Sequence, residues 1–452
     1  MQTTLNTLWK RMFFVALVVF LATAGPVSAA PKTLIEGITG PTFNLTATAD
    51  HIGTTDGGSY LMWLFADGVG RGQYPGPTLI VNEGDLVTVN LTNAISGPAT
   101  EPVSIIFPGQ TGVTAEGGAA GLITREASFG DALPVKYQFV AEKPGTYLYH
   151  SGTHMELQVE MGLLGVLIVR PAGFSSANPN AYGSAESAFD REYLFLITEM
   201  DPVIHNLVEF GRKNEIDNTK YWAVYWFLNG RTATDDLNQA HAPWLPTQPY
   251  NCSPLIHPGE KLLMRVVNAG RDLHPFHHHG SHADVIAVNG RPASSGAGQG
   301  IDLARSGFTI TAVPGQTVDA IFQWTGKGLN WDVYGTPADG RPAHDCVDND
   351  GDGFADPGVA GNNPFEYCPD HGKAFPVVLP ETQDVLIGAF YAGSPFLGGV
   401  GTLPPGEGGL NPYGGFSYMW HSHTEKELTN FDIYPGGLLT MLIVVPWSVD
   451  IP

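Results

Sequence analysis

A run of histidines between residues 274 and 282 is the stretch of this sequence best suited to chemistry. Residues 273–282 read Leu-His-Pro-Phe-His-His-His-Gly-Ser-His and hold five of the chain's 15 histidines. Proline and glycine exclude a regular helix and favour a strand leading into a tight loop. Alternate residues of a strand share a face, so His277 and His279 should point one way and His278 the other. Converging neutral imidazoles suit Cu, Zn, Fe or Ni, and we expect a metal site rather than a surface cluster.

Two smaller histidine groups lie elsewhere in the chain. His150 and His154 follow a predicted strand at residues 145–150, and His421 and His423 end another at residues 418–423. Functional side chains gather in the loops at strand ends. A single pair of histidines is modest evidence for a metal, so these two groups are interpreted together with the central run.

The elements that must position these histidines are predicted to be β-strands. Gly 56 and Pro 35 together make up about a fifth of the 452 residues, and short runs rich in Val, Thr, Tyr and Phe lie between them. This pattern favours β-sandwiches with turn-rich loops over helices. The expected strands are 60–65, 79–82, 86–91, 135–140, 145–150, 163–169, 193–198, 225–228, 261–268, 284–288, 308–313, 317–324, 418–423 and 437–445.

The strands predict two sandwich domains. We expect domain 1 at residues 30–172, a linker at 173–190 rich in Ala, Ser, Asn and Gly, and domain 2 at 191–452 with an insertion at about 331–415. Too few residues separate Tyr193 from His274 for a complete third sandwich, although three domains remain the alternative.

The first 29 residues are predicted to be a secretory signal peptide. Lys10 and Arg11 precede a short apolar run, and Val27-Ser-Ala29 resembles a cleavage site. We therefore expect a secreted or periplasmic protein without a membrane span, because no apolar run is long enough. The formal net charge of −22 argues against nucleic acid or anionic membranes as partners.

Several motifs, in order, resemble the multicopper oxidases, a family built from cupredoxin-type Greek-key β-sandwiches. They are the turn Tyr74-Pro-Gly-Pro-Thr78, the stretch at 145–150, His274-Pro-Phe-His-His-His-Gly280, and Trp420-His-Ser-His423 with Pro435-Gly-Gly-Leu438. The resemblance implies an all-β fold of tandem cupredoxin-like sandwiches. It covers most of residues 35–172 and 190–325, then 416–446.

The resemblance also implies copper and assigns ligands. In that family a type 1 copper takes an electron from substrate, and a cysteine flanked by histidines passes it to a trinuclear copper cluster, where oxygen becomes water. His274 matches a type 1 ligand, and His154 is plausible but shifted in spacing. The positions that match the cluster are His150, His277, His279, His421 and His423.

Departures from the family pattern affect both kinds of copper site. Ser422 replaces the type 1 cysteine and Glu427 replaces the next type 1 histidine, while residues 104–109 lack the expected first pair of histidines. A hydroxyl cannot supply the thiolate of a blue-copper site, so laccase-type turnover is not expected. Glu425 and Glu427 are interpreted as solvated loop charges, with metal binding or proton transfer as the alternative.

Smaller two-domain relatives build the cluster between domain 1 of one subunit and domain 2 of the next. If that applies here, the protein forms a ring, expected to be a homotrimer.

The insertion carries a second metal motif. Asp348, Asp350, Asp352 and Asp356 occupy positions 1, 3, 5 and 9 of a loop with Gly353 at position 6, which is the ligand spacing of a calcium loop. Val359 stands where an EF-hand has glutamate, and the loop resembles thrombospondin type 3 repeats. We expect a Cys346–Cys368 disulfide to clamp this loop, leaving Cys252 as a buried, inert thiol.

The sequence favours an exported copper-dependent oxidoreductase that uses a residual histidine site on a small reductant, a metal ion or a phenol. The alternative is a non-catalytic protein that binds or stores copper or serves as a structural cell-surface module. Zinc in the same histidines, with a hydrolytic water, is a third hypothesis.

Overall fold

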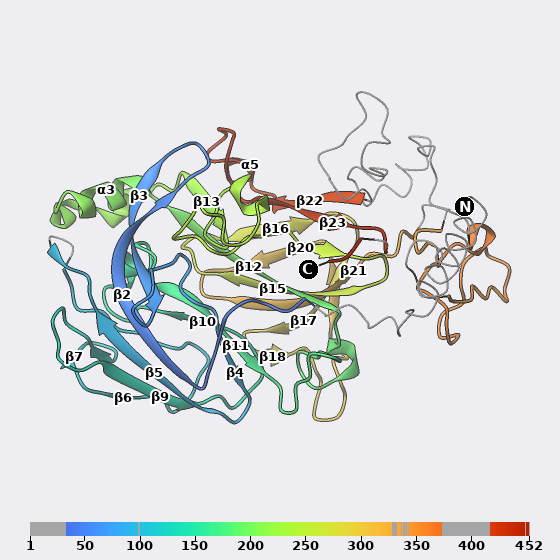
Figure 1. Ribbon diagram of the computed structural model, residues 1–452, viewed down its shortest axis with the longest axis horizontal. Coiled ribbons are helices and arrows are strands. Elements are labelled where there is room, and N and C mark those ends of the chain that lie inside the picture. The colour runs from blue at the N-terminus through green and yellow to red at the C-terminus, as the bar shows by residue number, and fades with distance from the viewer. Residues whose placement is uncertain are drawn as a thin grey trace, which may run out of the picture.

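The computed structural model describes residues 33–97, 100–327, 332–335, 337, 341, 343–372, 416–447 and 449–451. These residues form two packed β-sandwiches with a few short helices, so the predicted all-β, cupredoxin-like fold is confirmed (Figure 1). The predicted signal peptide and residues 373–415 of the predicted insertion lie outside the described residues. Within the described part, no helix is long and apolar enough to cross a membrane.

The first sandwich consists of two sheets and a small hairpin. Its five-stranded sheet has the order β3-β2-β5-β9-β6, formed by Ser59–Asp67, Thr42–Gly53, Leu86–Asn93, Val135–Val140 and Thr114–Glu116. The facing sheet has the order β1-β4-β11-β10, formed by Ile38–Thr39, Leu79–Asn82, Leu164–Arg170 and Gly145–His150. The hairpin pairs β7 (Ala119–Ala120) with β8 (Arg125–Glu126).

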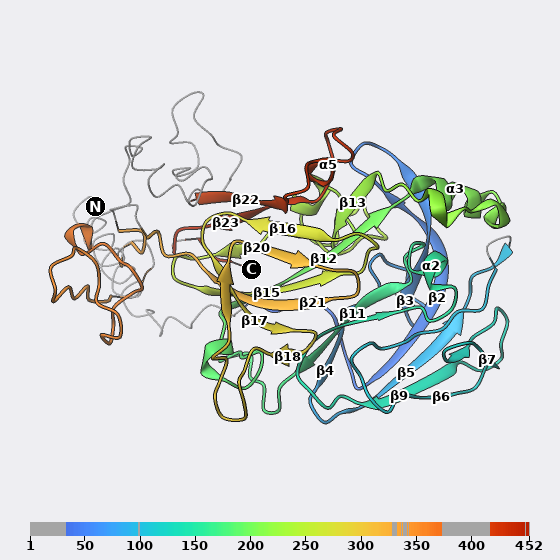
Figure 2. The same ribbon diagram turned by 180° about the vertical axis from the view of Figure 1, so that it is seen from behind.

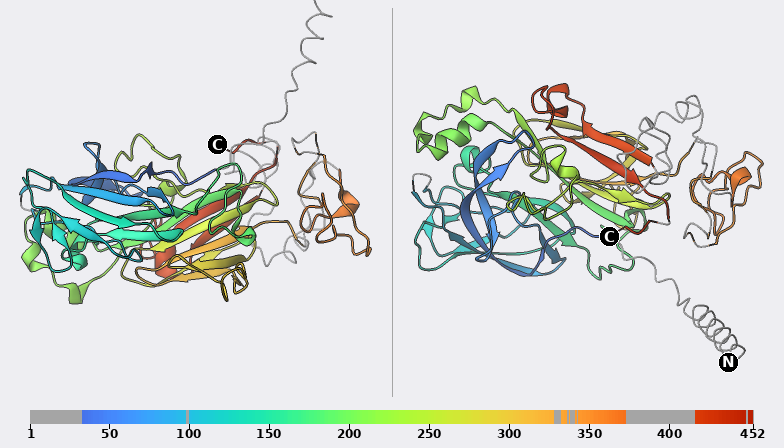
Figure 3. Two further views of the ribbon diagram at one scale, coloured as in Figure 1. Left: turned by 90° about the horizontal axis from the view of Figure 1, so that it is seen from below. Right: turned by 45° about the horizontal axis from the view of Figure 1, so that its top comes forward.

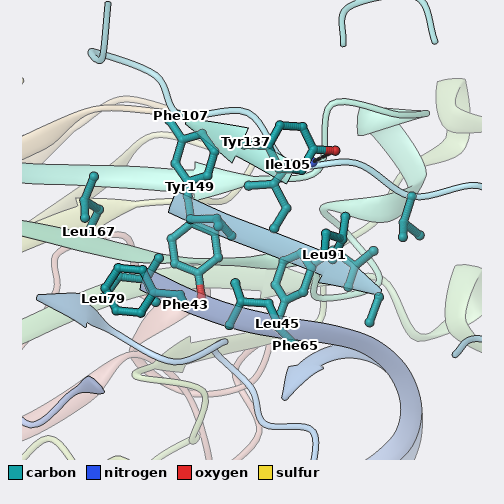
Figure 4. Packing of buried hydrophobic residues seen from close by; sticks show 14 of the residues in the cluster. Phe43, Leu45, Phe65, Leu79, Leu91, Ile105, Phe107, Tyr137, Tyr149 and Leu167 are labelled. Atoms are coloured by element: carbon teal, nitrogen blue, oxygen red, sulfur yellow. Dashed lines mark hydrogen bonds between the residues drawn. The ribbon is translucent and has the colours of Figure 1, made fainter. Parts of the chain in front are cut away.

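The long strand β2 was not predicted, although its burial alternates as a half-buried strand requires. Phe43, Leu45 and Ala47 are buried while the intervening polar side chains are more exposed. Figure 4 shows Phe43 and Leu45 packed with Phe65, Phe107 and Tyr149 in the core between the sheets. This core fixes β10, and therefore the position at which His150 ends that strand.

The second sandwich carries the central histidine run. One sheet has the order β13-β12-β15-β21-β17-β18 with β19 added to β17, formed by Tyr225–Leu228, Arg191–Met200, Lys261–Asn268, Thr317–Gln323, Ala283–Val288, Arg291–Pro292 and Arg305–Gly307. The other has the order β14-β23-β22-β16-β20, formed by Leu255–Ile256, Leu439–Val444, Phe416–Ser422, His274–His278 and Thr309–Ala312. The strands β16 and β22 are therefore neighbours inside the sheet, and they carry His274, His277, His278 and His421.

The two sandwiches lie side by side (Figures 2 and 3) and share an apolar interface and a buried ionic network. Leu148 and Ile168 of the first sandwich pack with Leu196 and Phe227 of the second. Beside them, the carboxylate of Glu192 accepts hydrogen bonds from Arg170 at 2.6 and 2.7 Å and from Arg265 at 2.6 Å. Burial raises the pKa of Glu192, but the two guanidinium charges outweigh it and hold that pKa at about 2.

The predicted linker and insertion have their own contacts. In the linker, Ala181 and Phe189 are buried against the second sandwich, so the segment is packed rather than free. In the insertion, Cys346 and Cys368 form a disulfide with a Cα–Cα distance of 5.4 Å. Residues 343–372, orange in Figures 1 and 2, lie at the end of the second sandwich that faces away from the first.

Candidate metal centre

The pairing of strands brings histidines from two distant segments into one row. In the antiparallel register, His277 of β16 lies opposite His421 of β22 on one side and Thr309 of β20 on the other. Directly opposed residues in antiparallel strands point to the same face with neighbouring Cβ atoms. His277 and His421 therefore meet because of the register, although 144 positions separate them in the sequence.

His279 and His423 complete a cluster around this pair. The His277 ring centroid lies 4.8 Å from that of His279 and 4.8 Å from that of His423. His421 Nε2 is 3.4 Å from His279 Nε2. Ligand atoms of His277, His279 and His421 all lie within 4.8 Å of one another, so a single ion could contact them together.

The protonation states of the cluster suit metal binding. His421 Nδ1 lies 2.7 Å from the Ser422 carbonyl oxygen, which can only accept, so Nδ1 donates and Nε2 keeps its lone pair toward the cluster. Burial, followed by the charges of His279, His421 and His423, lowers the pKa of His277 to about 4. Burial also lowers the pKa of His421. Convergent neutral imidazoles are a donor set that copper accepts.

Neighbouring residues hold the strand and loop that present the cluster. His278 points the other way, as predicted, and its Nε2 donates to the Gly307 carbonyl oxygen at 3.1 Å. Gly280 has a φ of +102°, and a Cβ there would meet the Tyr418 ring at 3.2 Å. Trp420 Nε1 donates to the His279 carbonyl oxygen at 2.8 Å, which ties the loop to β22.

His274 lies outside the cluster, in a buried triad with two carboxylates. Its Nε2 is 2.9 Å from Glu199 Oε2 and its Nδ1 is 2.9 Å from Glu427 Oε2. Burial lowers the pKa of His274, but the hydrogen bonds to Glu199 and Glu427 outweigh it and raise the pKa to about 9. His274 is therefore an imidazolium at neutral pH that donates from both nitrogens, which leaves no lone pair for a metal.

The three positions that resemble a type 1 copper site do converge, but with different chemistry. Ser422 Oγ donates to Glu427 Oε2 at 2.6 Å, the same oxygen that accepts from His274. The interpretation of Glu427 as a solvated loop charge is wrong, because its side chain is 2% exposed and lies at the centre of this network. Glu425 is exposed, as predicted.

Glu199 was missed by the sequence analysis. It lies at the end of β12 and also accepts hydrogen bonds from the backbone N–H groups of Arg271 and Asp272. It is 75 positions from His274 and belongs to no motif, so only the signal of a charged residue near the end of the apolar run 193–197 could have indicated it. The free thiol, Cys252, is buried elsewhere and its Sγ lies 4.0 Å from the Leu194 carbonyl oxygen.

His150 and His154 lie in the first sandwich, outside the group formed by His277, His279 and His421. His150 Nδ1 donates to the Ser151 carbonyl oxygen at 2.9 Å, so its Nε2 keeps a lone pair, and burial lowers its pKa. His154 precedes α2 (Met155–Gln158), is exposed, and lies 3.1 Å from Glu101 Oε2. His150 thus has the same tautomer as His421, whereas His154 pairs with a carboxylate at the surface.

The acidic loop of the insertion brings three of its four predicted ligands together. Carboxylate oxygens of Asp348, Asp350 and Asp356 lie within 4.8 Å of one another. Asp352 is outside that group, and its Oδ1 accepts from the Phe354 N–H at 2.8 Å. Asp348 also accepts from the Gly351 and Gly353 N–H groups, which curls the loop around the carboxylates.

Comparison with known proteins finds a family match in the first sandwich. Residues 68–173 match the family model described as multicopper oxidase. This part of the chain is therefore similar to the multicopper oxidases. Residues of this chain are 40% identical to L-ascorbate oxidase of Cucumis sativus over 103 positions, and 35% identical to the iron transport multicopper oxidase fetC of Epichloe festucae over 106 positions. These matches cover 22% and 23% of this chain but only 16% of each relative.

The fold comparison extends over more of the chain. The blue copper oxidase from Nitrosomonas europaea matches with a TM-score of 0.53 and 19% identity, over 89% of this chain and 85% of that one. A multicopper oxidase, mgLAC, matches with the same TM-score and identity over 89% and 86%. At this identity the likeness concerns the fold. Copper is the metal that similarity to the multicopper oxidases implies.

Proposed function

We propose that this protein is an exported copper-dependent oxidoreductase whose copper is held by His277, His279, His421 and His423 without a type 1 centre. The convergence of these four imidazoles across β16 and β22 is the observation that carries the proposal. Copper bound there would supply one-electron redox chemistry. The chain's own contribution is to keep the imidazoles neutral, oriented and close together.

The hydrogen bonds around the cluster perform that orientation. The Ser422 carbonyl oxygen fixes the His421 tautomer, and Thr309 Oγ1 lies 2.8 Å from His277 Nδ1, which leaves Nε2 of both rings for the metal. His423 is exposed and His277 and His279 are half-buried. A small reductant from solvent could therefore approach the histidines directly.

The triad of His274, Glu199 and Glu427 supports the absence of a type 1 copper. Two of the chain's three cysteines form the Cys346–Cys368 disulfide and Cys252 is distant from this network, so no thiolate stands beside His274. Hard carboxylates and an imidazolium do not fit the soft donor set of a blue-copper site. Electrons would then enter at the histidine cluster itself.

The proposed oligomer is a homotrimer. Because His150 and His154 stand apart from the cluster within one chain, a ring would allow these side chains of a neighbouring copy to approach it. The lone pair retained at His150 Nε2 is consistent with that role. A heterologous interface closes on itself under three-fold symmetry. Size-exclusion chromatography with light scattering would give the mass of a trimer, and a monomer would contradict this part of the proposal.

A second candidate function is copper binding without catalysis. The loss of a thiolate relay favours storage or buffering, because the histidines alone could bind and release copper. The two functions differ in turnover: a storage protein reacts once per bound copper, whereas an oxidoreductase consumes oxygen continuously while reductant remains.

Calcium in the acidic loop belongs to the proposal as a structural cofactor. The clustered oxygens of Asp348, Asp350 and Asp356 form a hard donor set of the kind that Ca²⁺ prefers. The disulfide closes this segment and limits its freedom when it is unfolded.

The test begins with copper-loaded protein. Elemental analysis and electron paramagnetic resonance should show at least one Cu(II) per chain without an intense blue band, and His277→Ala or His421→Ala should abolish that copper. His51→Asn, at an exposed ion pair with Glu209, is the matched control and should bind copper normally. Oxygen uptake is then followed with Fe²⁺, a phenol or ascorbate. Copper binding that is unchanged by the cluster substitutions would refute the site. Oxygen uptake that stops after one reaction per bound copper would leave storage as the function.

A further inference from the structure

A second group of nitrogen and oxygen donors lies in the segment 343–372, separate from the proposed copper cluster. His344 Nε2 and His371 Nδ1 lie 3.1 and 2.6 Å from the same atom, Glu366 Oε1. Glu366 is fully buried, and its other oxygen, Oε2, accepts a hydrogen bond from Asn363 Nδ2 at 2.8 Å. The three donor atoms lie within 4.8 Å of one another.

A second buried carboxylate, that of Asp332, lies near this group. Asp332 is 3% exposed, and its Oδ1 accepts from the Tyr334 N–H at 2.7 Å, while its Oδ2 has no hydrogen-bond partner. Burial, followed by the negative charge of Glu366, raises the pKa of Asp332, whereas His371 acts in the opposite direction. An unpartnered buried carboxylate oxygen beside a second buried carboxylate is costly unless a cation is present.

The nearby arginine does not supply that cation directly. Arg341 stacks over the Trp447 ring at 4.3 Å and donates to Asn363 Oδ1, so its guanidinium supports the amide that orients Glu366. Among the described residues, no hydrogen bond or ion pair joins Arg341 to either carboxylate. Glu366 Oε1 is thus contacted by two imidazoles, and its Oε2 by the Asn363 amide.

We propose that His344, Glu366 and His371 bind a divalent transition metal ion of the Zn²⁺ class, with Asp332 facing the site from the body of the sandwich. Zn²⁺ is typically held by imidazole nitrogens and a carboxylate oxygen in a tetrahedron, with ligand atoms roughly 3.3 Å apart. The observed separations of 2.6 and 3.1 Å would need to open by about 0.7 and about 0.2 Å to reach that spacing. Mixed imidazole and carboxylate donors distinguish this site from the all-oxygen calcium loop.

The place of the site in the fold indicates what the metal does. Glu366 and the acidic loop are joined because the Ala355 N–H donates to the Glu366 carbonyl oxygen at 2.9 Å. On the other side, Tyr334 belongs to the core of the second sandwich and donates its hydroxyl to the Pro364 carbonyl oxygen at 2.6 Å. A metal at Glu366 would therefore staple the disulfide-closed segment to the sandwich.

Zinc titration of the metal-stripped, full-length protein tests the inference. Calorimetry with Zn²⁺ alone should show one equivalent beyond any zinc held by the histidine cluster, and this equivalent should be lost, or weakened by about tenfold or more, in His371→Asn and in Glu366→Gln. The His277→Ala and His421→Ala variants should keep that equivalent. Co²⁺ in place of Zn²⁺ should give visible bands of tetrahedral N/O coordination in the wild type and not in His371→Asn.

Controls separate loss of the site from loss of the fold. The His371 side chain is 32% exposed, so His371→Asn should keep the far-ultraviolet circular dichroism spectrum even if Glu366→Gln unfolds the segment. His241→Asn, an exposed histidine paired with Glu36, is the matched control and should bind zinc as the wild type does. Unchanged zinc stoichiometry and affinity in a folded His371→Asn protein would overturn the proposal. Failure of the copper proposal would appear instead in the His277 and His421 variants.

Discussion

The buried triad of His274, Glu199 and Glu427 should make the stability of this protein fall as pH rises above neutrality. The pKa of His274 is about 9 in the folded protein, against 6.5 for a free histidine, because both nitrogens donate to carboxylates. A folded-state pKa above the unfolded value means that the folded state binds the proton more tightly. The stabilisation is therefore complete below pH 6.5 and is lost between pH 6.5 and about 9.

The size of the effect follows from the same pKa difference. A pKa raised from 6.5 to about 9 corresponds to about 3 kcal/mol of unfolding free energy. The triad is almost completely buried, so solvent screening does not reduce this figure much. Guanidinium unfolding of the metal-free protein at pH 6, 7.5, 9 and 10 should show this loss.

Substitution of His274 separates the triad from other titrating groups. His274→Gln should lower stability at pH 6 by about 3–5 kcal/mol, because two buried carboxylates lose their cation, and it should flatten the dependence between pH 6.5 and 9. His51→Asn should retain the wild-type profile, because that histidine is exposed. A wild-type profile that is flat over this window, or an equal slope in His274→Gln, would refute the assignment of an imidazolium to His274.

Three further outcomes are expected. The double substitution Ser422→Cys with Glu427→His should create the intense copper–thiolate absorption band of a blue site beside His274 when Cu²⁺ is added. Ser422→Ala should not create this band. Absence of the band in a copper-loaded double variant would show that these positions cannot form a type 1 site. In denaturant titrations, Arg265→Met should lower the unfolding free energy by about 3–5 kcal/mol, because Glu192 and Asp319 lose a buried partner. Arg212→Met, at an exposed ion pair, should lower it by less than about 1 kcal/mol. Equal effects of the two substitutions would contradict the role of burial. In thermal melts, calcium at about 100 times its Kd should stabilise the wild type by about 2.7 kcal/mol. The double substitution Asp350→Asn with Asp356→Asn should remove that gain, while Asp302→Asn should keep it. A gain that survives the double substitution would rule out the acidic loop as the calcium site.

Local patterns were sufficient to predict most of the longer strands and the face of the central histidine run. Pro275 and Gly280 limited the run to a short strand with a turn, and alternation then separated His278 from its neighbours. The strand β2 was missed although its first residues, Thr-Phe-Asn-Leu-Thr-Ala, alternate polar and apolar side chains. Its sequence therefore carried the same strand signal as its neighbours.

Contacts between distant segments could not be predicted from spacing alone. The register that sets His277 opposite His421 depends on the core beneath both strands, where Phe276 and Trp420 pack with Phe195. Glu199 reaches His274 because β12 ends beside β16, which is a property of the whole sandwich. The sequence resemblance aligned Glu427 with a type 1 histidine position. The charge of its side chain then led to the wrong prediction that it is solvated.

The side chains at the positions that resemble a type 1 copper site support one another chemically. If Ser422 alone replaced a thiolate, a neutral His274 would remain beside an unpartnered hydroxyl in a buried pocket. Glu427 accepts from both of these groups through one oxygen, and Glu199 accepts from the other face of the imidazole. Every polar atom is satisfied without a metal, so the pocket is stable as an ion network. The neighbouring imidazoles differ in this respect. In the described part of the chain, the rings of His277 and His421 form no hydrogen bond or ion pair with a carboxylate, and His421 Nε2 lies 3.4 Å from His279 Nε2. That contrast within a few residues of β16 and β22 is why copper is proposed at the histidine cluster and not at the buried network around His274.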